Sequence, residues 1–347
     1  MSPARWQGIW SRRGLLAWLL WPISLLYGVL FALRSALYAA GLLKVQHLPV
    51  PVVVVGNVVV GGAGKTPTVI ALVKHLQNKG WTPGVVSRGY GRHSSAVLAV
   101  HPDTPPAASG DEPALIQRAT GVPVWVAPRR ADAAFALLAA HPEVNLLLCD
   151  DGLQHLALGR DLAVAVFDDR GSGNGWLLPA GLLREPWPPR AGNRFQPDLV
   201  LHQRRDEAPS HQPFTNTGLP EFSALRRLAN EAISPQGQRI ALDALRGQAL
   251  TAVAGIARPE VFFEMLRARG LTLTHTVALP DHADTSAYVG LLHAPGALVC
   301  TEKDAVKLFA ALPANRGAVW AVPLELSPEP AFWTALDSLL PARPVGR

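Results

Sequence analysis

The sequence predicts an α/β protein of two domains preceded by an apolar N-terminal helix, and three observations support this. The 347 residues exceed what one compact core usually holds. Strand-like runs of β-branched residues alternate with helix-like segments from about residue 50 onward. A polar, proline-containing stretch interrupts this alternation, which then resumes. The predicted divisions are an apolar helix region over 1–45, a core domain over 46–215, a linker over 216–238 and a smaller α/β domain over 239–347.

The first element is an uncharged stretch from Leu15 to Leu33, which is at the lower edge of the length that crosses a bilayer. A cleaved signal peptide is disfavoured because the apolar run is too long and no clear cleavage site follows it. A buried helix of a soluble protein is an alternative. We interpret the stretch as a membrane anchor that either spans the bilayer or lies in its interface. Four tryptophans near its start suit the headgroup level, namely Trp6, Trp10, Trp18 and Trp21.

The second element is a strand followed by a glycine-rich turn. Val52 to Val55 is typical of a strand buried on both faces of a parallel sheet, and Lys65-Thr66-Pro67 then opens a helix. Backbone N–H groups of such a turn face a nucleotide's phosphates, the lysine reaches the β- and γ-phosphates, and the threonine hydroxyl binds Mg²⁺. We therefore predict a P-loop NTPase-like core domain that binds ATP. The predicted cofactor-binding residues are Val59, Val60, Gly61, Gly62, Ala63, Gly64, Lys65 and Thr66.

Val59 departs from the usual motif, which has glycine at that position. A merely flexible turn is the alternative interpretation, but it does not explain why Lys65-Thr66 follows at once. Because ATP chemistry takes place in the cytoplasm, we expect the domains after the anchor to be cytoplasmic.

Composition agrees with an anionic ligand. The formal net charge is +6, which favours a nucleotide, a nucleic acid or an acidic lipid. The chain has no long Lys/Arg run and no repeat that mixes aromatic with basic residues, so nucleic acid is the weakest of the three. Cys149 and Cys300 each end an apolar run and are interpreted as core cysteines of a reducing compartment.

Acidic residues follow two of the later elements. Asp111 and Glu112 precede a helix-like segment, where capping explains one of them and a role as base or metal ligand remains open for the other. Val144 to Cys149 reads as a buried strand that ends in Asp150 and Asp151. An apolar strand ending in acids is typical of a Walker B element, whose carboxylate holds Mg²⁺ directly or through water.

Three residues are candidate substrate ligands. Arg88 lies in a basic, glycine-rich stretch after a predicted strand, where it would grip phosphate or remain a surface residue of a solvated turn. Asn174 and Arg184 belong to the glycine-rich, apolar and basic segment over 171–186, which is neither strand nor helix. Long ordered loops of this kind tend to be functional. We expect this one to accept an apolar, anionic substrate, and a flexible connector is the alternative.

The smaller domain contributes two clusters. His282 follows a predicted strand, as a base or as an ordinary loop histidine. The sequence from Thr301 to Asp304 is similar to a guanine-reading motif, but Glu302 occupies the place of its lysine. GTP is therefore not inferred.

Taken together, these segments resemble the tetraacyldisaccharide 4'-kinase (lipid A 4'-kinase) family. Matching segments follow one another in a fixed order along nearly all of the chain after the anchor. They are Val55-Gly56-Asn57, Gly61 to Pro67, Ser87 to Gly91, Gly110 to Pro113, Asp150 to Gln154, Leu178 to Pro186, Gly255 to Glu260, Pro280 to His282 and Thr301 to Lys307.

The resemblance implies a kinase at the cytoplasmic face of the bacterial inner membrane, with a two-stranded linker between its domains. The reaction would transfer the ATP γ-phosphate to the 4'-hydroxyl of tetraacyldisaccharide 1-phosphate and give lipid IVA. Asp111 would be the catalytic base, paired with His282, and Lys65 would also be catalytic. The implied Mg²⁺ ligands are Thr66 and an acid among Glu112, Asp150 and Asp151. The departures, Ala63 and Ala283, remove no functional group.

Two rival interpretations belong to other classes. A membrane-associated P-loop switch would hydrolyse nucleotide and phosphorylate nothing, but it does not predict Asp111 together with His282. A non-enzymatic lipid-binding module leaves Lys65-Thr66 and the paired acids without a role.

Overall fold

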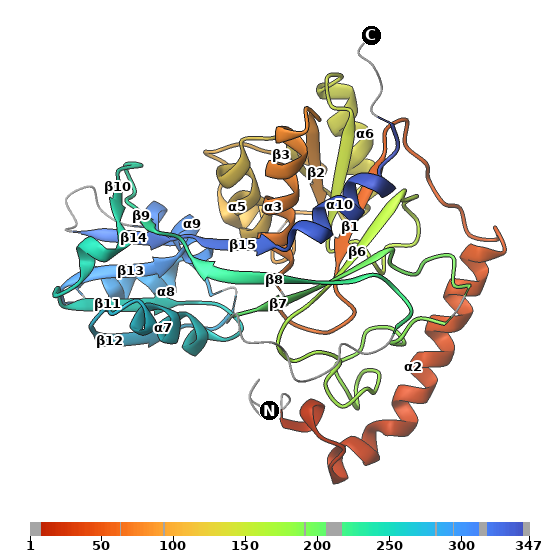
Figure 1. The fold of residues 1–347 in the computed structure, drawn as a ribbon, viewed down its shortest axis with the longest axis horizontal. Coiled ribbons are helices and arrows are strands. Elements are labelled where there is room, and N and C mark those ends of the chain that lie inside the picture. Colours follow the sequence, from red (N-terminus) through yellow and green to blue (C-terminus); the bar gives the residue numbers. More distant parts are fainter. Residues whose placement is uncertain are drawn as a thin grey trace.

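The computed structural model describes residues 8–62, 64–92, 94–190, 192–205, 217–281, 283–293, 295–311 and 318–342. It confirms the predicted α/β fold, with a large and a small sheet and an apolar N-terminal helix (Figure 1). His282 and Ala63 lie outside the described residues.

The large sheet has nine strands in the order β15-β8-β7-β6-β1-β5-β2-β4-β3. The strands from β8 to β4 in this order run parallel, and the two edge strands are antiparallel to their neighbours. Their bounds are β1 Val52–Gly56, β2 Pro83–Ser87, β3 Leu98–Val100, β4 Val124–Val126, β5 Leu146–Asp150, β6 Leu162–Phe167, β7 Leu199–Arg204, β8 Glu221–Leu228 and β15 Leu324–Pro328.

The central strands are continuous apolar runs because helices cover both faces of the sheet. Every residue of β1, β5 and β6 is buried, as expected of a parallel sheet inside an α/β sandwich. One core includes alternate residues of β1, such as Val53 and Val55, and the other includes Val52 and Val54. The first core contains residues of α3 Lys65–Asn78, α5 Asp111–Thr120 and α10 Pro330–Leu339, and the second contains residues of α6 Arg130–Ala140. A short helix, α4 Pro106–Ser109, precedes α5.

The small sheet has six strands in the order β10-β9-β14-β13-β11-β12. Its four strands from β14 to β12 are parallel, and two antiparallel strands complete one edge. Its elements are β9 Glu231–Ile233, β10 Arg239–Ala241, η1 Leu242–Leu245, β11 Leu250–Ala254, α7 Pro259–Ala268, β12 Leu273–Ala278, α8 Ser286–Val289, η2 Gly290–His293, β13 Ala297–Thr301, α9 Glu302–Ala311 and β14 Val319–Val322.

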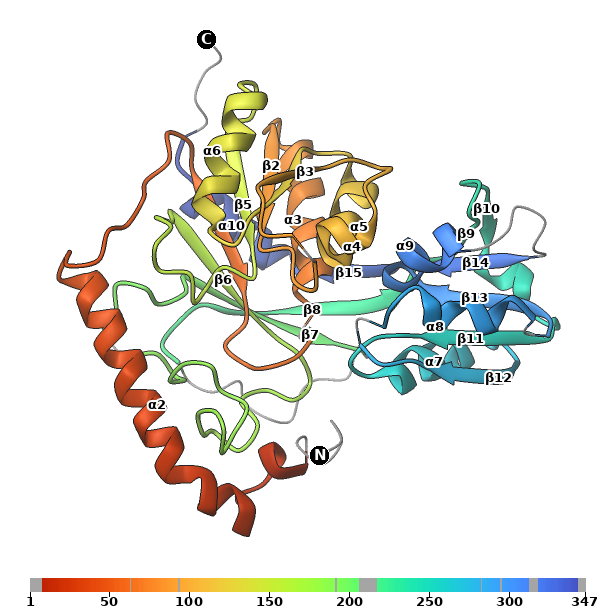
Figure 2. The same ribbon diagram turned by 180° about the vertical axis from the view of Figure 1, so that it is seen from behind.

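Among the described residues, two strands cross between the two sheets. β8 leads from the large sheet toward the small domain, and β15 pairs antiparallel with it and leads back (Figures 1 and 2). The second crossing returns the C-terminus to the core, where Phe332 and Leu336 of α10 are fully buried in the first core. Residues 324–342, predicted within the smaller domain, therefore pack on the large sheet. The reason is that β15 needs β8 as its hydrogen-bonding partner.

The N-terminal helix α2, Leu15–Ala39, runs along the loops that follow β6 (Figures 1 and 2). Its inner stripe recurs every three or four residues and includes Ala17, Ser24 and Gly28. The Ser24 hydroxyl donates to the Leu177 carbonyl at 2.8 Å. The opposite face is apolar and exposed, as the 79% exposure of Leu15 illustrates. The helix is long and apolar enough to cross a membrane, yet one of its faces is bound to the core domain.

Candidate phosphate-transfer site

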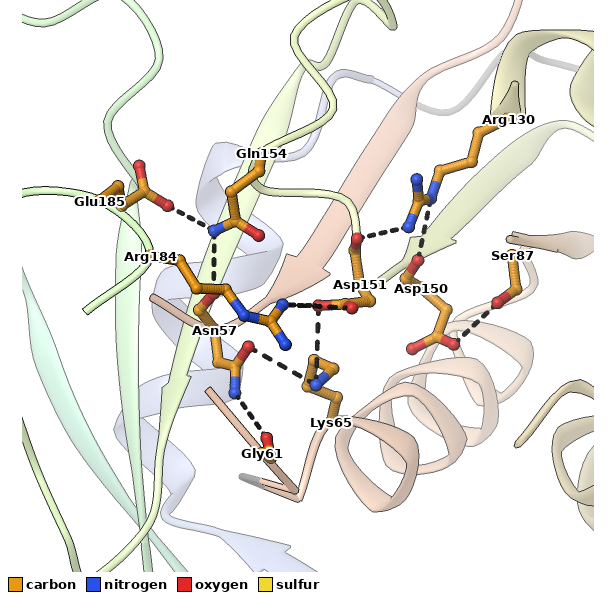
Figure 3. Close-up of polar contacts among 10 residues, drawn as sticks. All are labelled: Asn57, Gly61, Lys65, Ser87, Arg130, Asp150, Asp151, Gln154, Arg184 and Glu185. Atoms are coloured by element: carbon orange, nitrogen blue, oxygen red, sulfur yellow. Dashed lines mark hydrogen bonds and ion pairs between the residues drawn. The ribbon is translucent and has the colours of Figure 1, made fainter. Parts of the chain in front are cut away.

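The parallel sheet brings the predicted phosphate loop and the Walker B acids together. β1 and β5 are neighbours with Val55 opposite Asp150, so the segments that follow both strands leave the same sheet edge. Lys65 Nζ lies 3.6 Å from Asp151 Oδ1 and 3.5 Å from Asn57 Oδ1 (Figure 3). The predicted lysine and the predicted acid thus meet without help from the small domain.

Gly64 shows why the loop requires glycine. Its φ of 75° is left-handed, and a Cβ placed on it would come within 1.9 Å of Gln203 Oε1. Gln203 of β7 donates from Nε2 to the Gly64 carbonyl at 2.7 Å and to Thr68 Oγ1 at 2.9 Å. This buried amide fixes the start of α3. No local pattern indicates its role, because Gln203 lies on a strand that is distant in the sequence.

Val59 is tolerated because the chain is extended there. It is fully buried, bridges antiparallel to Leu183, and lacks the positive φ that would demand glycine. The neighbouring Val60 N–H donates to the Leu182 carbonyl at 2.9 Å. The loop after β1 is therefore tied to the 171–186 segment, the predicted substrate loop.

Asp150 and Asp151 are held by one arginine that sequence reasoning missed. Arg130, at the start of α6, donates to the Asp150 carbonyl at 3.2 Å and to the Asp151 carbonyl at 2.6 Å (Figure 3). Asp151 has a φ of 49°, a left-handed backbone conformation that is uncommon for residues other than glycine and that recurs at functional sites. Although burial opposes ionisation, the cations of Lys65 and Arg184 hold the pKa of Asp151 below its usual value.

Asp150 has the opposite electrostatics. Burial raises the pKa of Asp150 to about 7, and the negative charges of Glu112 and Asp151 add to the effect. Ser87 donates to Oδ2 at 3.1 Å, whereas Oδ1 is buried with no hydrogen-bond partner. A buried carboxylate oxygen without a donor is costly unless something positive faces it.

These groups fit a divalent cation. Thr66, Glu112 and Asp151 line one cavity, and the unpartnered oxygen of Asp150 belongs to the adjacent strand end. No group of three His, Cys, Asp or Glu in the described residues is close enough to form a complete metal cage. Mg²⁺ does not need one, because it keeps several waters and binds substrate phosphates beside one or two carboxylates.

Asp111, the predicted base, is the first residue of α5 and is buried. It follows Gly110, whose φ is 90° and which lies against the Gly89 and Tyr90 backbone. Asp111 Oδ2 accepts a hydrogen bond of 2.7 Å from Lys307 Nζ, which comes from α9 of the small domain. Lys307 was not a predicted site residue, although it belongs to the Thr301–Lys307 segment.

The three predicted substrate ligands fare differently. Arg184 lines the cavity and its Nη1 lies 3.2 Å from Asp151 Oδ1. Asn174 is buried, and its amide donates to the Ala180 carbonyl at 2.8 Å and accepts from the Trp176 N–H at 3.0 Å. This arrangement favours a structural role for Asn174 over the predicted substrate contact. Arg88 is exposed just after β2, and its role stays a prediction.

The cavity lies between the two domains and has a volume of about 590 Å³. The core domain contributes the phosphate loop, Glu112 and Asp151, and the small domain contributes apolar residues of α7 such as Phe262 together with Lys303. Asp281 receives a 2.7 Å hydrogen bond from Lys303. Residues of the small domain therefore face the phosphate loop across this cavity.

Asp304 has a structural role in the small domain. It is fully buried, and it accepts hydrogen bonds from the Gly255 N–H at 2.9 Å and the Tyr288 hydroxyl at 2.6 Å. Its carboxylate therefore joins α9 to α8 and to the residue that follows β11.

These features define a P-loop nucleotide-binding enzyme. A strand leads into a glycine-rich loop, a lysine and a threonine begin the following helix, and acids lie at the end of the neighbouring strand. A family model described as LpxK, tetraacyldisaccharide-1-P 4'-kinase, matches residues 16–341. The chain belongs to this family. Its apolar N-terminal helix and its α/β core agree with the family that its sequence motifs resemble.

Curated relatives and a solved structure agree with this assignment. A tetraacyldisaccharide 4'-kinase of Polaromonas naphthalenivorans is 56% identical over 331 residues, covering 95% of this chain and 93% of the relative. One of Acidovorax sp. (strain JS42) is 55% identical and covers 97% and 94%. The crystal structure of LpxK from Aquifex aeolicus in complex with ATP is 28% identical, with a TM-score of 0.77 and coverage of 94% and 99%.

Proposed function

We infer that this chain is an ATP-dependent lipid kinase that phosphorylates the 4'-hydroxyl of tetraacyldisaccharide 1-phosphate, which gives lipid IVA. The observation that carries the inference is one interdomain cavity lined by both the phosphate loop and Glu112, the neighbour of Asp111. Family membership supplies the identity of the acceptor.

The residues divide the work of phosphoryl transfer, which depends mainly on positioning and charge neutralisation. Lys65 and the N–H groups at the start of α3 neutralise the γ-phosphate. Asp111 accepts the proton of the 4'-hydroxyl as that oxygen attacks phosphorus, and the bond from phosphorus to the β-phosphate oxygen of ATP breaks. His282, adjacent to the described Asp281 and Ala283, is proposed as the partner of Asp111.

We propose that Mg²⁺ is bound by Thr66 and by acids among Glu112, Asp150 and Asp151. The ion supplies charge neutralisation for the β- and γ-phosphates when bound. Asp150 is the member whose unpartnered buried oxygen most needs a cation. Ionisation of the Asp150 carboxyl group costs the least free energy when the cation is bound beside it.

The Mg²⁺ assignment is tested by Asp150→Asn. This variant should raise the Mg²⁺ concentration required for half-maximal activity by roughly tenfold or more, as one lost ligand typically does. In EDTA at pH 8, above the pKa of about 7, it should also unfold at a higher temperature than the unsubstituted protein, because it removes a buried carboxylate charge. An unchanged Mg²⁺ requirement would remove Asp150 from the ligand set.

We propose that α2 lies in the membrane interface and does not cross the bilayer as a free span. Its inner face is hydrogen-bonded to the core through Ser24 to Leu177 and through the Tyr27 hydroxyl to the Arg184 carbonyl at 2.6 Å. A helix that crossed the bilayer alone would have to leave these partners. The exposed face, rich in leucine, would bury in the cytoplasmic leaflet of the bacterial inner membrane and give access to the lipid acceptor.

Vesicle flotation tests this membrane geometry. Leu19→Glu with Leu26→Glu should abolish binding to vesicles of phosphatidylglycerol and phosphatidylethanolamine, because both leucines are more than half exposed. The matched control is Leu339→Glu on α10, an exposed leucine of the same type. Equal flotation of both variants would contradict the assignment.

The kinase inference itself is tested with ATP labelled in the γ-phosphate, Mg²⁺ and the tetraacyldisaccharide phosphate in mixed micelles. Label should move to the lipid only when all three are present. Nucleotide hydrolysis without labelled lipid would favour the switch interpretation, in which Asp111 has no acceptor to deprotonate.

A further inference from the structure

We propose that Lys307 is a positioning residue that docks the small domain onto Asp111 and so positions the proposed base. The inference deepens the proposed function because it rests on Asp111 as the base. Lys307 is not among the described residues that line the cavity. Any effect of Lys307 on turnover would therefore pass through Asp111 and the loop that follows His282.

The contact joins distant parts of the chain. Lys307 Nζ lies 2.7 Å from Asp111 Oδ2 and 2.8 Å from the Ala283 carbonyl oxygen, and the two ionic residues are 196 positions apart. One ammonium group therefore bonds the first residue of α5 in the core domain and the residue after His282 in the small domain. A single cation therefore joins the proposed base, Asp111, to the small domain.

Burial makes this ion pair different from the surface pairs. The side chains of Lys307 and Asp111 are only 10% and 6% exposed. Exposed pairs contribute little to stability, whereas removing one partner of a buried pair leaves a charge without compensation. The two charges compensate each other only while the domains are in contact. Domain approach and the position of the base are thus linked physically.

The helix that carries Lys307 is itself fixed. Asp304 bonds the Gly255 N–H and the Tyr288 hydroxyl, and it anchors the first turn of α9 within the small domain. Lys303 and Lys307 are four residues apart and share a helix face. That face also includes the contact between Lys303 and Asp281. A rigid helix therefore delivers the ammonium group, which limits how far Asp111 and Ala283 can shift relative to each other.

A loss of positioning should lower turnover more than nucleotide binding. Lys307→Ala should lower kcat by roughly 10- to 100-fold, since small misplacements of reacting groups have effects of this size. The KM for ATP should stay within about twofold, because Lys65 and its partners lie wholly in the core domain. Lys307→Arg should recover part of kcat because it restores the positive charge. The recovery should be incomplete because the head group is longer and differently shaped.

A double-mutant cycle separates this role from a general structural one. In the Asp111→Ala background, Lys307→Ala should cause no further loss in kcat, because the group that it positions is gone. The control is Lys79→Ala, which removes an exposed ion pair of 2.9 Å between the residue that follows α3 and Asp337 of α10. Losses that multiply in the double variant, an unchanged kcat, or a higher kcat in Lys307→Ala would each overturn the proposal.

Amide hydrogen exchange measures the docking of the small domain on the core domain without relying on turnover. Lys307→Ala should increase amide exchange at 111–114 and 283–286, and Lys79→Ala should leave these segments unchanged. Unchanged exchange in Lys307→Ala overturns the proposal even if the kinase activity of the wild-type protein is normal. Failure of the wild-type protein to label the lipid is a separate result, which overturns the proposed function and leaves the docking measured by exchange in place.

Discussion

Two buried lysines, Lys65 and Lys307, face aspartates at opposite ends of the proposed reaction. Lys65 lies 3.6 Å from Asp151 inside the core domain, and both follow neighbouring strands of one sheet. Lys307 lies 2.7 Å from Asp111 across the domain boundary. The proposed donor end is therefore built by one sheet edge, whereas the proposed acceptor end combines residues of two domains. Substitutions at the donor end should affect both ATP binding and turnover, and those at the acceptor end should affect turnover with little change in the KM for ATP.

The largest effect is expected for Lys65→Ala. Turnover should fall by at least about 10³-fold, because the γ-phosphate loses its main cation. Transfer of label from ATP to lipid is the measurement, with Lys74→Ala on the exposed face of the same helix as the control. Substantial residual transfer would show that the donor end does not depend on this lysine.

Asp111→Ala should reduce kcat by roughly 10²–10⁴-fold, the usual effect of removing a positioned general base. The KM for ATP should change little, which distinguishes this variant from Lys65→Ala. Asp132→Ala provides the control, since Asp132 is also an acid in the first turn of a helix. A near-normal kcat would contradict the assignment of Asp111 as base, and His282→Ala examines its proposed partner in the same assay.

A smaller effect, about tenfold in kcat/KM or about 1.4 kcal/mol, is expected for Arg184→Ala. Arg184 and Lys65 share Asp151, so removal of the arginine leaves the carboxylate to attract Lys65 away from phosphate. Steady-state kinetics with ATP as the varied substrate is the measurement. Arg190→Ala, an exposed arginine nearby, should match the wild-type protein. Equal kinetics for Arg184→Ala and Arg190→Ala would show that Arg184 does not contribute to the donor end.

The smallest effect is expected for Tyr27→Phe. The lost hydrogen bond to the Arg184 carbonyl has a net worth of about 1 kcal/mol, so kcat/KM for the lipid should fall by roughly two- to fivefold. Tyr38→Phe is the control, because the Tyr38 ring lies 6.4 Å from Phe195 and away from Arg184. An unchanged kcat/KM for the lipid in Tyr27→Phe would contradict a role of this hydrogen bond in supporting the loop around Arg184.

Local patterns predicted much of the fold and most of the donor end. The β-branched run over 52–55 and the apolar run before Asp150 have few other structures open to them, and parallel pairing then forces their ends together. Cys149 and Cys300 are buried, as predicted. By contrast, β8 was hidden in the stretch interpreted as a connection, because it is only half-buried and its charged residues obscure the alternation.

The acceptor end could not be derived from local pattern. Nothing near Lys307 indicates that its ammonium group meets a carboxylate 196 residues away, and Gln203 looks like any polar residue at a strand end. Such contacts depend on tertiary geometry. The return of β15 and α10 to the core was missed for the same reason, since strand pairing between 221–228 and 324–328 leaves no local trace.

The binding of α2 to the core has a practical consequence for purification. Deleting the helix to obtain a detergent-free protein would remove Ser24 and Tyr27 from the backbone around Leu177 and Arg184. The truncated protein would keep its nucleotide pocket and lose support for the loop beside it. Exchanging the exposed leucines for polar residues while retaining the inner stripe is the better route to a soluble and active kinase. The apolar helix thus also supports the core domain.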